Sequence, residues 1–230
     1  MNLVEIFFQV VAFLFAISVH ESAHAWTASR CGDPTARMLG RVTLNPIKHI
    51  DPIGTVLLPL IAMISHFPVI GWAKPTPVDP RNFRHEVRDD ILTSIAGPIS
   101  NLLVAAGAVL ALAVISLTSQ QGRDIVWMLA VSYGQAMSMM TGASSILVPL
   151  AGMLYHLMFI NVLLAAFNII PVPPLDGSHV LRHMLPEGAR RMYDTLGMFG
   201  LILLFLVGGP VIGMVMTPFL NFFTYVLTRF

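Results

Sequence analysis

Residues 13–30 read FLFAISVHESAHAWTASR and place two histidines and a glutamate directly after an apolar run. The apolar run begins at Leu3, so the window from Leu3 to Ala28 exceeds the roughly 20 residues that a membrane helix needs. Hydrophobic residues make up 56% of the 230 residues and charged residues 11%, whereas soluble domains have roughly 45–50% and about 25%. The sequence therefore predicts an all-α polytopic membrane protein with the lipid bilayer as its solvent.

Further apolar windows raise the expected number of transmembrane helices to about five to six. The windows are 53–72, 91–117, 146–170 and 196–227, and Gly208-Gly209-Pro210 is expected to split the last one into two helices. The stretch 125–143 is apolar but rich in Ser, Gly and Met, and it could span, lie in the interface or fold back. We expect one integral-membrane domain over residues 1–230, with a core at about 1–180 and C-terminal helices at about 195–228. The N-terminal run lacks the basic start of a signal peptide and is interpreted as a permanent helix.

The charged residues predict the orientation of the chain in the membrane. Basic residues gather in three loops, at 29–50, 73–90 and 176–194, which the positive-inside tendency places in the cytoplasm. Two of these loops flank residues 53–72. Because both are predicted on the same side of the membrane, this window is predicted to enter and leave on that side as a re-entrant segment, with a true crossing as the alternative. The net charge of +1 gives no case for a nucleic-acid partner. A single cysteine, Cys31, excludes an intramolecular disulfide and a Cys-rich metal site.

His20-Glu21-Ser22-Ala23-His24 has the pattern H-E-x-x-H. On a helix the two histidines lie on one face and can bind one metal ion, and the glutamate between them can accept a proton from an activated water. Ionisable residues in a membrane helix are costly and usually mark a functional site. The alternative is that the histidines form interhelical hydrogen bonds while Glu21 extends to the interface.

A zinc hydrolase needs a third protein ligand. The elongated soluble motif would require Gly at 27 and His at 30, where this chain has Thr27 and Arg30, so that arrangement is excluded. In FNIIPVPPLDGSHVL at 167–181, the prolines must unwind the backbone, and we expect Asp176 to follow on unwound chain with Gly177 permitting a close approach. A simple Asp-Gly turn is the alternative for Asp176. Other candidates for the third ligand are His49, His156 and His179.

Four pieces of the sequence together resemble the site-2 protease family of intramembrane zinc metalloproteases, in its minimal form without a PDZ or CBS domain. The pieces are HESAH at 20–24, GWAKPTPVDP at 71–80, AGPISN at 96–101 and NIIPVPPLDG at 168–177. The resemblance implies one Zn²⁺ per chain, held by His20, His24 and Asp176, with Glu21 as the general base. It implies that Asn168 positions or polarises the scissile carbonyl and that Asn101 lies near the site as an auxiliary polar group.

The resemblance also implies a re-entrant or β-like membrane segment near 53–80. Within it, Trp72, Ala73, Lys74 and Pro75 would form part of an extended edge, running to Pro77, that pairs with an unwound substrate. Taken alone, the stretch is a Pro-rich interfacial loop with a Trp anchor.

The expected substrates are single-pass transmembrane proteins or peptides already trimmed by another protease. The expected location is the bacterial inner membrane, with the active site nearer the cytoplasmic side. A non-catalytic metal-binding membrane protein, a cation transporter and a catalytically inactive relative of the family are the rival interpretations.

Overall fold

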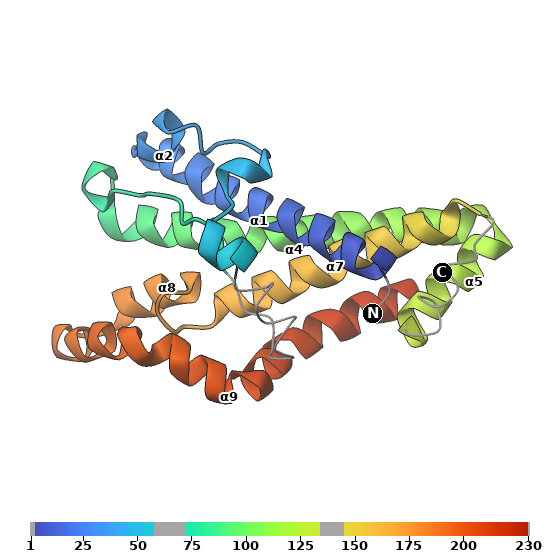
Figure 1. Cartoon of the computed structure of the whole chain (residues 1–230). Coiled ribbons are helices and arrows are strands. Elements are labelled where there is room, and N and C mark those ends of the chain that lie inside the picture. Colours follow the sequence, from blue (N-terminus) through green and yellow to red (C-terminus); the bar gives the residue numbers. More distant parts are fainter. Residues whose placement is uncertain (1–2, 58–71, 134–144, 230) are drawn as a thin grey trace. The chain divides into compact units, whose positions relative to one another are not determined.

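A computed structural model describes residues 3–57, 72–133 and 145–229 of the chain (Figure 1). The described residues contain helices and no strand, so the predicted all-α class is confirmed. The elements in chain order are α1 (Leu3–Cys31), α2 (Thr35–Met38), the 3₁₀ turn η1 (Pro46–Lys48), the π-helical turn η2 (Pro52–Leu57), the 3₁₀ turn η3 (Pro80–Asn82), α4 (Glu86–Thr118), α5 (Gln120–Val131), α7 (Leu147–Ile169), α8 (Asp176–Met184) and α9 (Glu187–Leu227).

Helices α1, α4 and α7 are long and apolar enough to cross a membrane. They contain 29, 33 and 23 residues, whereas about 20 residues span the hydrocarbon core. In lipid every backbone N–H and C=O must be satisfied within the protein, which a continuous helix achieves by itself. Three of the predicted apolar windows are thereby confirmed as helices, and the total of five to six crossings stays a prediction.

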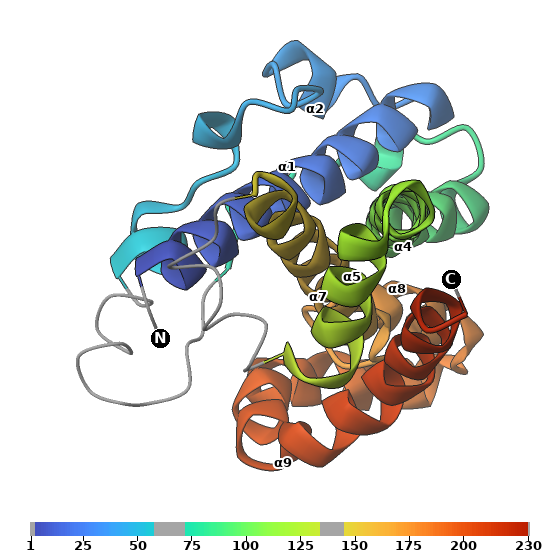
Figure 2. The ribbon, with the colours of Figure 1, turned by 90° about the vertical axis from the view of Figure 1, so that its right-hand side faces the viewer.

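The chain divides into two compact units, of which the first comprises Met1–Ala16 and Pro98–Phe230. Within this unit α7 packs against α5, α8 and α9, as Figure 2 shows for α5 and α9. The apolar core includes Leu112, Met158 and Val162, which are completely buried. Asn101 of α4 is also completely buried and donates to the carbonyl of Ala16 and to the side-chain oxygen of Asn161.

The second unit comprises Ile17–Gly97 and contains the C-terminal half of α1, the short turns and the start of α4. Its loops are held together by Asp33, which is completely buried directly after α1. The Asp33 carboxylate accepts hydrogen bonds from Thr35, from the backbone N–H of Asp79 and from the side chain of Asn82. Burial alone raises the pKa of Asp33, but these hydrogen bonds outweigh it and lower the pKa below its usual value.

The structure corrects the predicted split of the C-terminal window. Helix α9 continues from Glu187 to Leu227 through residues 208–210, with Pro210 and Pro218 inside it. A proline removes one backbone hydrogen bond and bends a helix, but the helical backbone of α9 continues past both prolines.

Two other predictions fall partly outside the described residues. The re-entrant or β-like segment near 53–80 includes residues 58–71, and the stretch 125–143 includes residues 134–143, and these lie outside the described part. On either side of the first gap, residues 52–57 form η2, and residues 72–79 are neither helix nor strand.

Candidate metal centre and catalytic base

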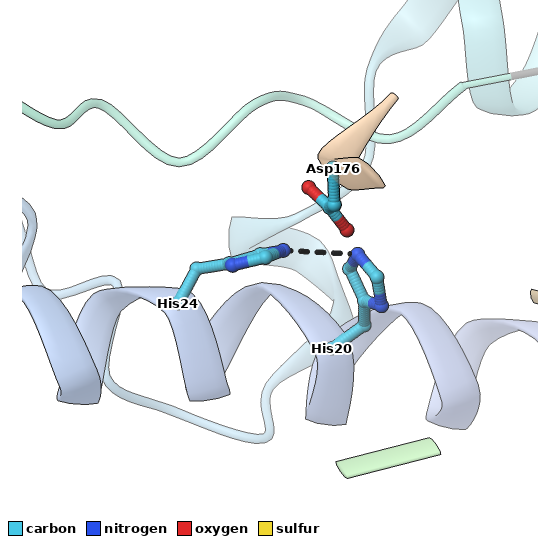
Figure 3. A group of neighbouring side chains, drawn as sticks. All are labelled: His20, His24 and Asp176. Carbon is cyan, nitrogen blue, oxygen red and sulfur yellow. Dashed lines mark hydrogen bonds between the residues drawn. The ribbon is translucent and has the colours of Figure 1, made fainter. Parts of the chain in front are cut away.

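His20 and His24 present their imidazoles on one face of α1 (Figure 3). The two side chains are buried, with 7% and 8% of their surface exposed. Their Nε2 atoms lie 3.0 Å apart. Two ligands of a tetrahedral zinc ion, each at about 2.0–2.1 Å from it, lie about 3.4 Å apart. The pair therefore converges as two nitrogen ligands of one small cation would.

A backbone carbonyl fixes the orientation of the second imidazole. His24 Nδ1 lies 2.7 Å from the carbonyl oxygen of Thr93. A carbonyl only accepts, so Nδ1 carries a proton and donates it, which leaves Nε2 as the ring nitrogen that can bind a metal ion. Such a bond from the second ring nitrogen sets the tautomer and basicity of a metal-binding histidine.

Gly97 of α4 leaves the space that the two imidazoles occupy. A Cβ atom at position 97 would lie 2.4 Å from His24 Nε2 and 2.6 Å from His20 Cε1. Both distances are far below an ordinary van der Waals contact, so only glycine fits here without moving a ring. The two imidazoles are buried, their Nε2 atoms converge, Nδ1 of His24 is held by a carbonyl, and Gly97 leaves room for both rings. All four features fit a metal ion bound by these two histidines.

Glu21, between the two histidines, points its carboxylate at Thr76. Oε2 of Glu21 accepts a hydrogen bond from the backbone N–H of Thr76 at 2.9 Å and from the Thr76 hydroxyl at 2.7 Å. Glu21 is only partly buried. An ionised carboxylate accepts such bonds especially strongly, so Thr76 holds the proposed base in one orientation.

In residues 72–76 every second backbone N–H, at positions 72, 74 and 76, donates a hydrogen bond to another residue of this unit. The N–H of Trp72 donates to the carbonyl of Gly54 at 3.3 Å, and the N–H of Lys74 donates to that of His49 at 2.9 Å. The Trp72 ring lies against Gly54 and is 48% exposed. Alternate bonding is typical of extended backbone, in which successive residues face opposite sides. Ala73 makes no hydrogen bond to any described residue through its N–H or C=O.

Arg41 braces the same segment from a buried position. Its guanidinium donates to the carbonyl oxygens of Lys48 and Lys74 and, at 3.0 Å, to that of Pro75. Burial lowers the pKa of Arg41, and the negative charge of Glu21 opposes this shift. The arginine joins the 44–50 loop to the 72–76 segment.

Sequence reasoning missed Thr76 and Arg41 as parts of the site. In the sequence, Arg41 is one of several loop arginines, and its only signal there is its contribution to the positive charge that predicts topology. The signal for Thr76 in the sequence is its place between Pro75 and Pro77, within the segment that is predicted to pair with substrate.

The structure corrects the predicted backbone at Asp176. The unwound stretch is 170–175, and Asp176 is the first residue of α8. A carboxylate is favoured in the first turn of a helix, where the backbone N–H groups carry partial positive charge. The expected close approach at Gly177 is confirmed, because a Cβ there would lie 2.1 Å from the carbonyl oxygen of Ile169.

The two predicted asparagines lie in the first unit. Asn168, near the end of α7, donates from Nδ2 to the carbonyl of Leu164 at 3.0 Å. Asn101 donates to Ala16 and Asn161 at 3.2 and 2.7 Å and thereby links α1, α4 and α7. A catalytic role for Asn168 and a substrate contact for Asn101 stay predictions.

The other histidines considered as the third ligand have different surroundings. His49 is completely buried, and its Nε2 lies 2.8 Å from the Thr43 carbonyl. His156 lies 2.8 Å from the Gly152 carbonyl through Nδ1 and 2.8 Å from the Tyr133 hydroxyl through Nε2. His179 is exposed on α8. Both ring nitrogens of His156 and one of His49 are thus used in structural hydrogen bonds.

Comparison with known proteins gives consistent matches. The model described as "Peptidase family M50" matches residues 8–207. YwhC of Bacillus subtilis (strain 168) is 34% identical over 213 residues, which are 92% of this chain and 85% of YwhC. Rip2 of Mycolicibacterium smegmatis is 28% identical over 195 residues, which are 84% of this chain and 63% of Rip2. Both relatives are named "Putative zinc metalloprotease". No solved structure matches the chain.

We predict that Gly97→Ala removes the bound metal without unfolding the protein. The added methyl group displaces the imidazoles of His20 and His24, whereas alanine stabilises a helix relative to glycine by about 0.5–1 kcal/mol. Metal content, measured by mass spectrometry of the purified protein, should fall well below one per chain. Gly107→Ala on the same helix is the matched control, because a Cβ there meets nothing within 4 Å. Equal metal content in both variants would contradict the prediction.

Proposed function

The chain belongs to peptidase family M50, and we propose that it hydrolyses peptide bonds within or near transmembrane segments of other membrane proteins. It is a metalloprotease with zinc as its cofactor, and three of its helices are apolar enough to span a membrane. The observation that carries the proposal is the buried histidine pair, with Nε2 atoms 3.0 Å apart, on one of these helices. A hydrolytic centre on a membrane helix is suited to substrates that lie in the membrane.

We assign the zinc ligands to His20, His24 and Asp176. Two imidazole nitrogens and one carboxylate oxygen are a donor set of the kind that catalytic zinc uses. His156 uses both ring nitrogens in structural hydrogen bonds, which disfavours it as a ligand. When bound, zinc acts as a Lewis acid that polarises a carbonyl and lowers the pKa of water.

Glu21 acts as general base and then as general acid. Its carboxylate takes a proton from the attacking water and returns it to the leaving nitrogen, so one residue serves both steps. Asn168 positions the scissile carbonyl through its side-chain amide. Because a helical substrate keeps its carbonyls in hydrogen bonds, the substrate must unwind before Glu21 and Asn168 can act on it.

The substrate binds as an extended strand along Trp72, Ala73, Lys74 and Pro75, which is the mode of strand addition to an exposed edge. The N–H groups of Trp72 and Lys74 already donate within the protein, and Pro75 has no N–H. The N–H and C=O of Ala73 therefore offer the pair of backbone groups for a substrate strand. This assignment places one substrate residue in register opposite Ala73.

The expected substrates are single-pass transmembrane proteins or peptides, and the expected location is the bacterial inner membrane with the site nearer the cytoplasm. The basic residues that follow α1 and precede α4 support this orientation through the positive-inside tendency. We interpret residues 1–230 as one metalloprotease domain with a core at about 1–180.

A metal transporter or an inactive relative is the rival function. A transporter would release its metal as part of its cycle and would not need Glu21 as a base. An inactive relative would bind transmembrane segments without cutting them. Both rivals predict that a transmembrane peptide remains intact.

Mass spectrometry of a model transmembrane peptide, incubated with zinc-loaded protein in detergent, tests the function. Wild type should cut within the apolar segment, and Glu21→Gln should lower the rate by about 10²–10⁴-fold, the usual contribution of a general base. Identical cutting by both would assign the cleavage to a contaminant. Intact peptide in both samples would favour the rivals.

Asp176→Ala should lower zinc to well below one per chain, because two histidines alone bind the ion weakly. Asp124→Ala, at an exposed position of α5, is the matched control and should keep its zinc. Elemental analysis of dialysed protein measures both variants. Full retention of zinc in Asp176→Ala would move the third ligand to another residue.

Ala73→Pro should impair cleavage, because it removes the one N–H that the proposed substrate strand can use. Loss of a neutral hydrogen bond of about 0.5–1.5 kcal/mol corresponds to a fall in kcat/KM of roughly twofold to tenfold. Ala73→Ser keeps the N–H and serves as the comparison. Equal kcat/KM for the two variants, at full zinc content, would show that this edge does not pair with substrate.

A further inference from the structure

Thr76 makes two hydrogen bonds to one oxygen of the Glu21 side chain. The backbone N–H lies 2.9 Å and the hydroxyl oxygen 2.7 Å from Oε2. The hydroxyl also lies 3.1 Å from the backbone carbonyl oxygen of Glu21. A hydroxyl has one proton to donate, and the shorter contact assigns that proton to Oε2.

The two oxygens of the carboxylate are thereby placed in different surroundings. Oε2 receives both donors from Thr76, whereas Oε1 accepts no hydrogen bond from any described residue. A carboxylate that acts as a base needs one oxygen to take up the proton. With Oε2 engaged by Thr76, Oε1 is the carboxylate oxygen that can take up a proton.

The backbone around Thr76 is restrained by its two proline neighbours and by hydrogen bonds of the same segment. Pro75 and Pro77 flank Thr76, fix their own φ angles and restrict the residue before them to extended backbone. Arg41 binds the carbonyl of Pro75 at 3.0 Å, and the N–H of Lys74 binds the His49 carbonyl at 2.9 Å. Thr76 thus presents its donors from a braced segment.

We propose that Thr76 is a positioning residue for Glu21, which its hydroxyl holds so that Oε1 accepts the proton of the attacking water. The proposal rests on the proposed function, because it assigns the base of that reaction. In this proposal Thr76 acts on the reaction through Glu21, the side chain to which it donates. Through Thr76 the base on α1 is also joined to the segment that carries the proposed substrate edge.

Thr76→Val and Thr76→Ser separate the hydroxyl from the shape of the side chain. Valine keeps the branched shape and the backbone N–H but lacks the hydroxyl, whereas serine keeps the hydroxyl and lacks the methyl group. Hydrogen bonds to charged groups are the stronger class, so Thr76→Val should lower kcat by about tenfold with KM and zinc content unchanged. Thr76→Ser should restore most of kcat. Thr118→Val, at the exposed end of α4, controls for a general effect of the substitution.

Two results of the kinetic comparison would overturn the proposal. Equal kcat for wild type and Thr76→Val would show that the hydroxyl does not assist the base. A higher KM at unchanged kcat would assign Thr76 to substrate binding instead.

A second measurement does not depend on cleavage. Backbone hydrogen exchange in the 72–79 segment should be faster in Glu21→Ala than in wild type at Thr76, because its N–H loses its acceptor. Unchanged exchange at Thr76 would overturn the proposal whatever the activity. Faster exchange together with an inactive wild type would confirm the contact but refute both the proposed function and the positioning role that rests on it.

Discussion

The cost of keeping two imidazoles and a carboxylate at the end of an apolar helix is the constraint on which the second unit depends. Buried polar groups must find hydrogen-bond partners or a metal ion. His24 finds the Thr93 carbonyl on α4, and Glu21 finds Thr76 in the 72–79 segment. These partners are far from α1 in the sequence, so the loops between the two helices are shaped by the polar atoms of α1 as much as by apolar packing.

Much of the fold and of the site follows from local properties of the sequence. Apolar length alone located α1, α4 and α7, because a helix satisfies its backbone within one segment. The spacing of His20 and His24 placed both imidazoles on one face. Local rules failed at residues 208–210, where glycine and proline do not end α9. They also failed at Asp176, because the prolines that unwind the chain before it also lead into a new helix.

Other parts of the site could not be predicted from local patterns. Gly97 looks like one more small residue in an apolar helix until the histidine rings are seen beside it. Arg41 looks like an orientation signal, yet it is 5% exposed and binds three backbone carbonyls. Both roles arise from contacts between segments far apart in the sequence, and irregular chain has no periodicity that would reveal such contacts.

Pro75 and Pro77 have a consequence for the behaviour of the protein outside catalysis. An extended segment with a row of unpaired N–H and C=O groups is a template for aggregation, and proline on such an edge is one way to prevent it. Between Trp72 and Pro77, only Ala73 retains an N–H without an acceptor among the described residues. Among the described residues, this segment therefore offers a single unpaired backbone donor between Trp72 and Pro77, which is too few for a second copy to pair with it as a continuous sheet.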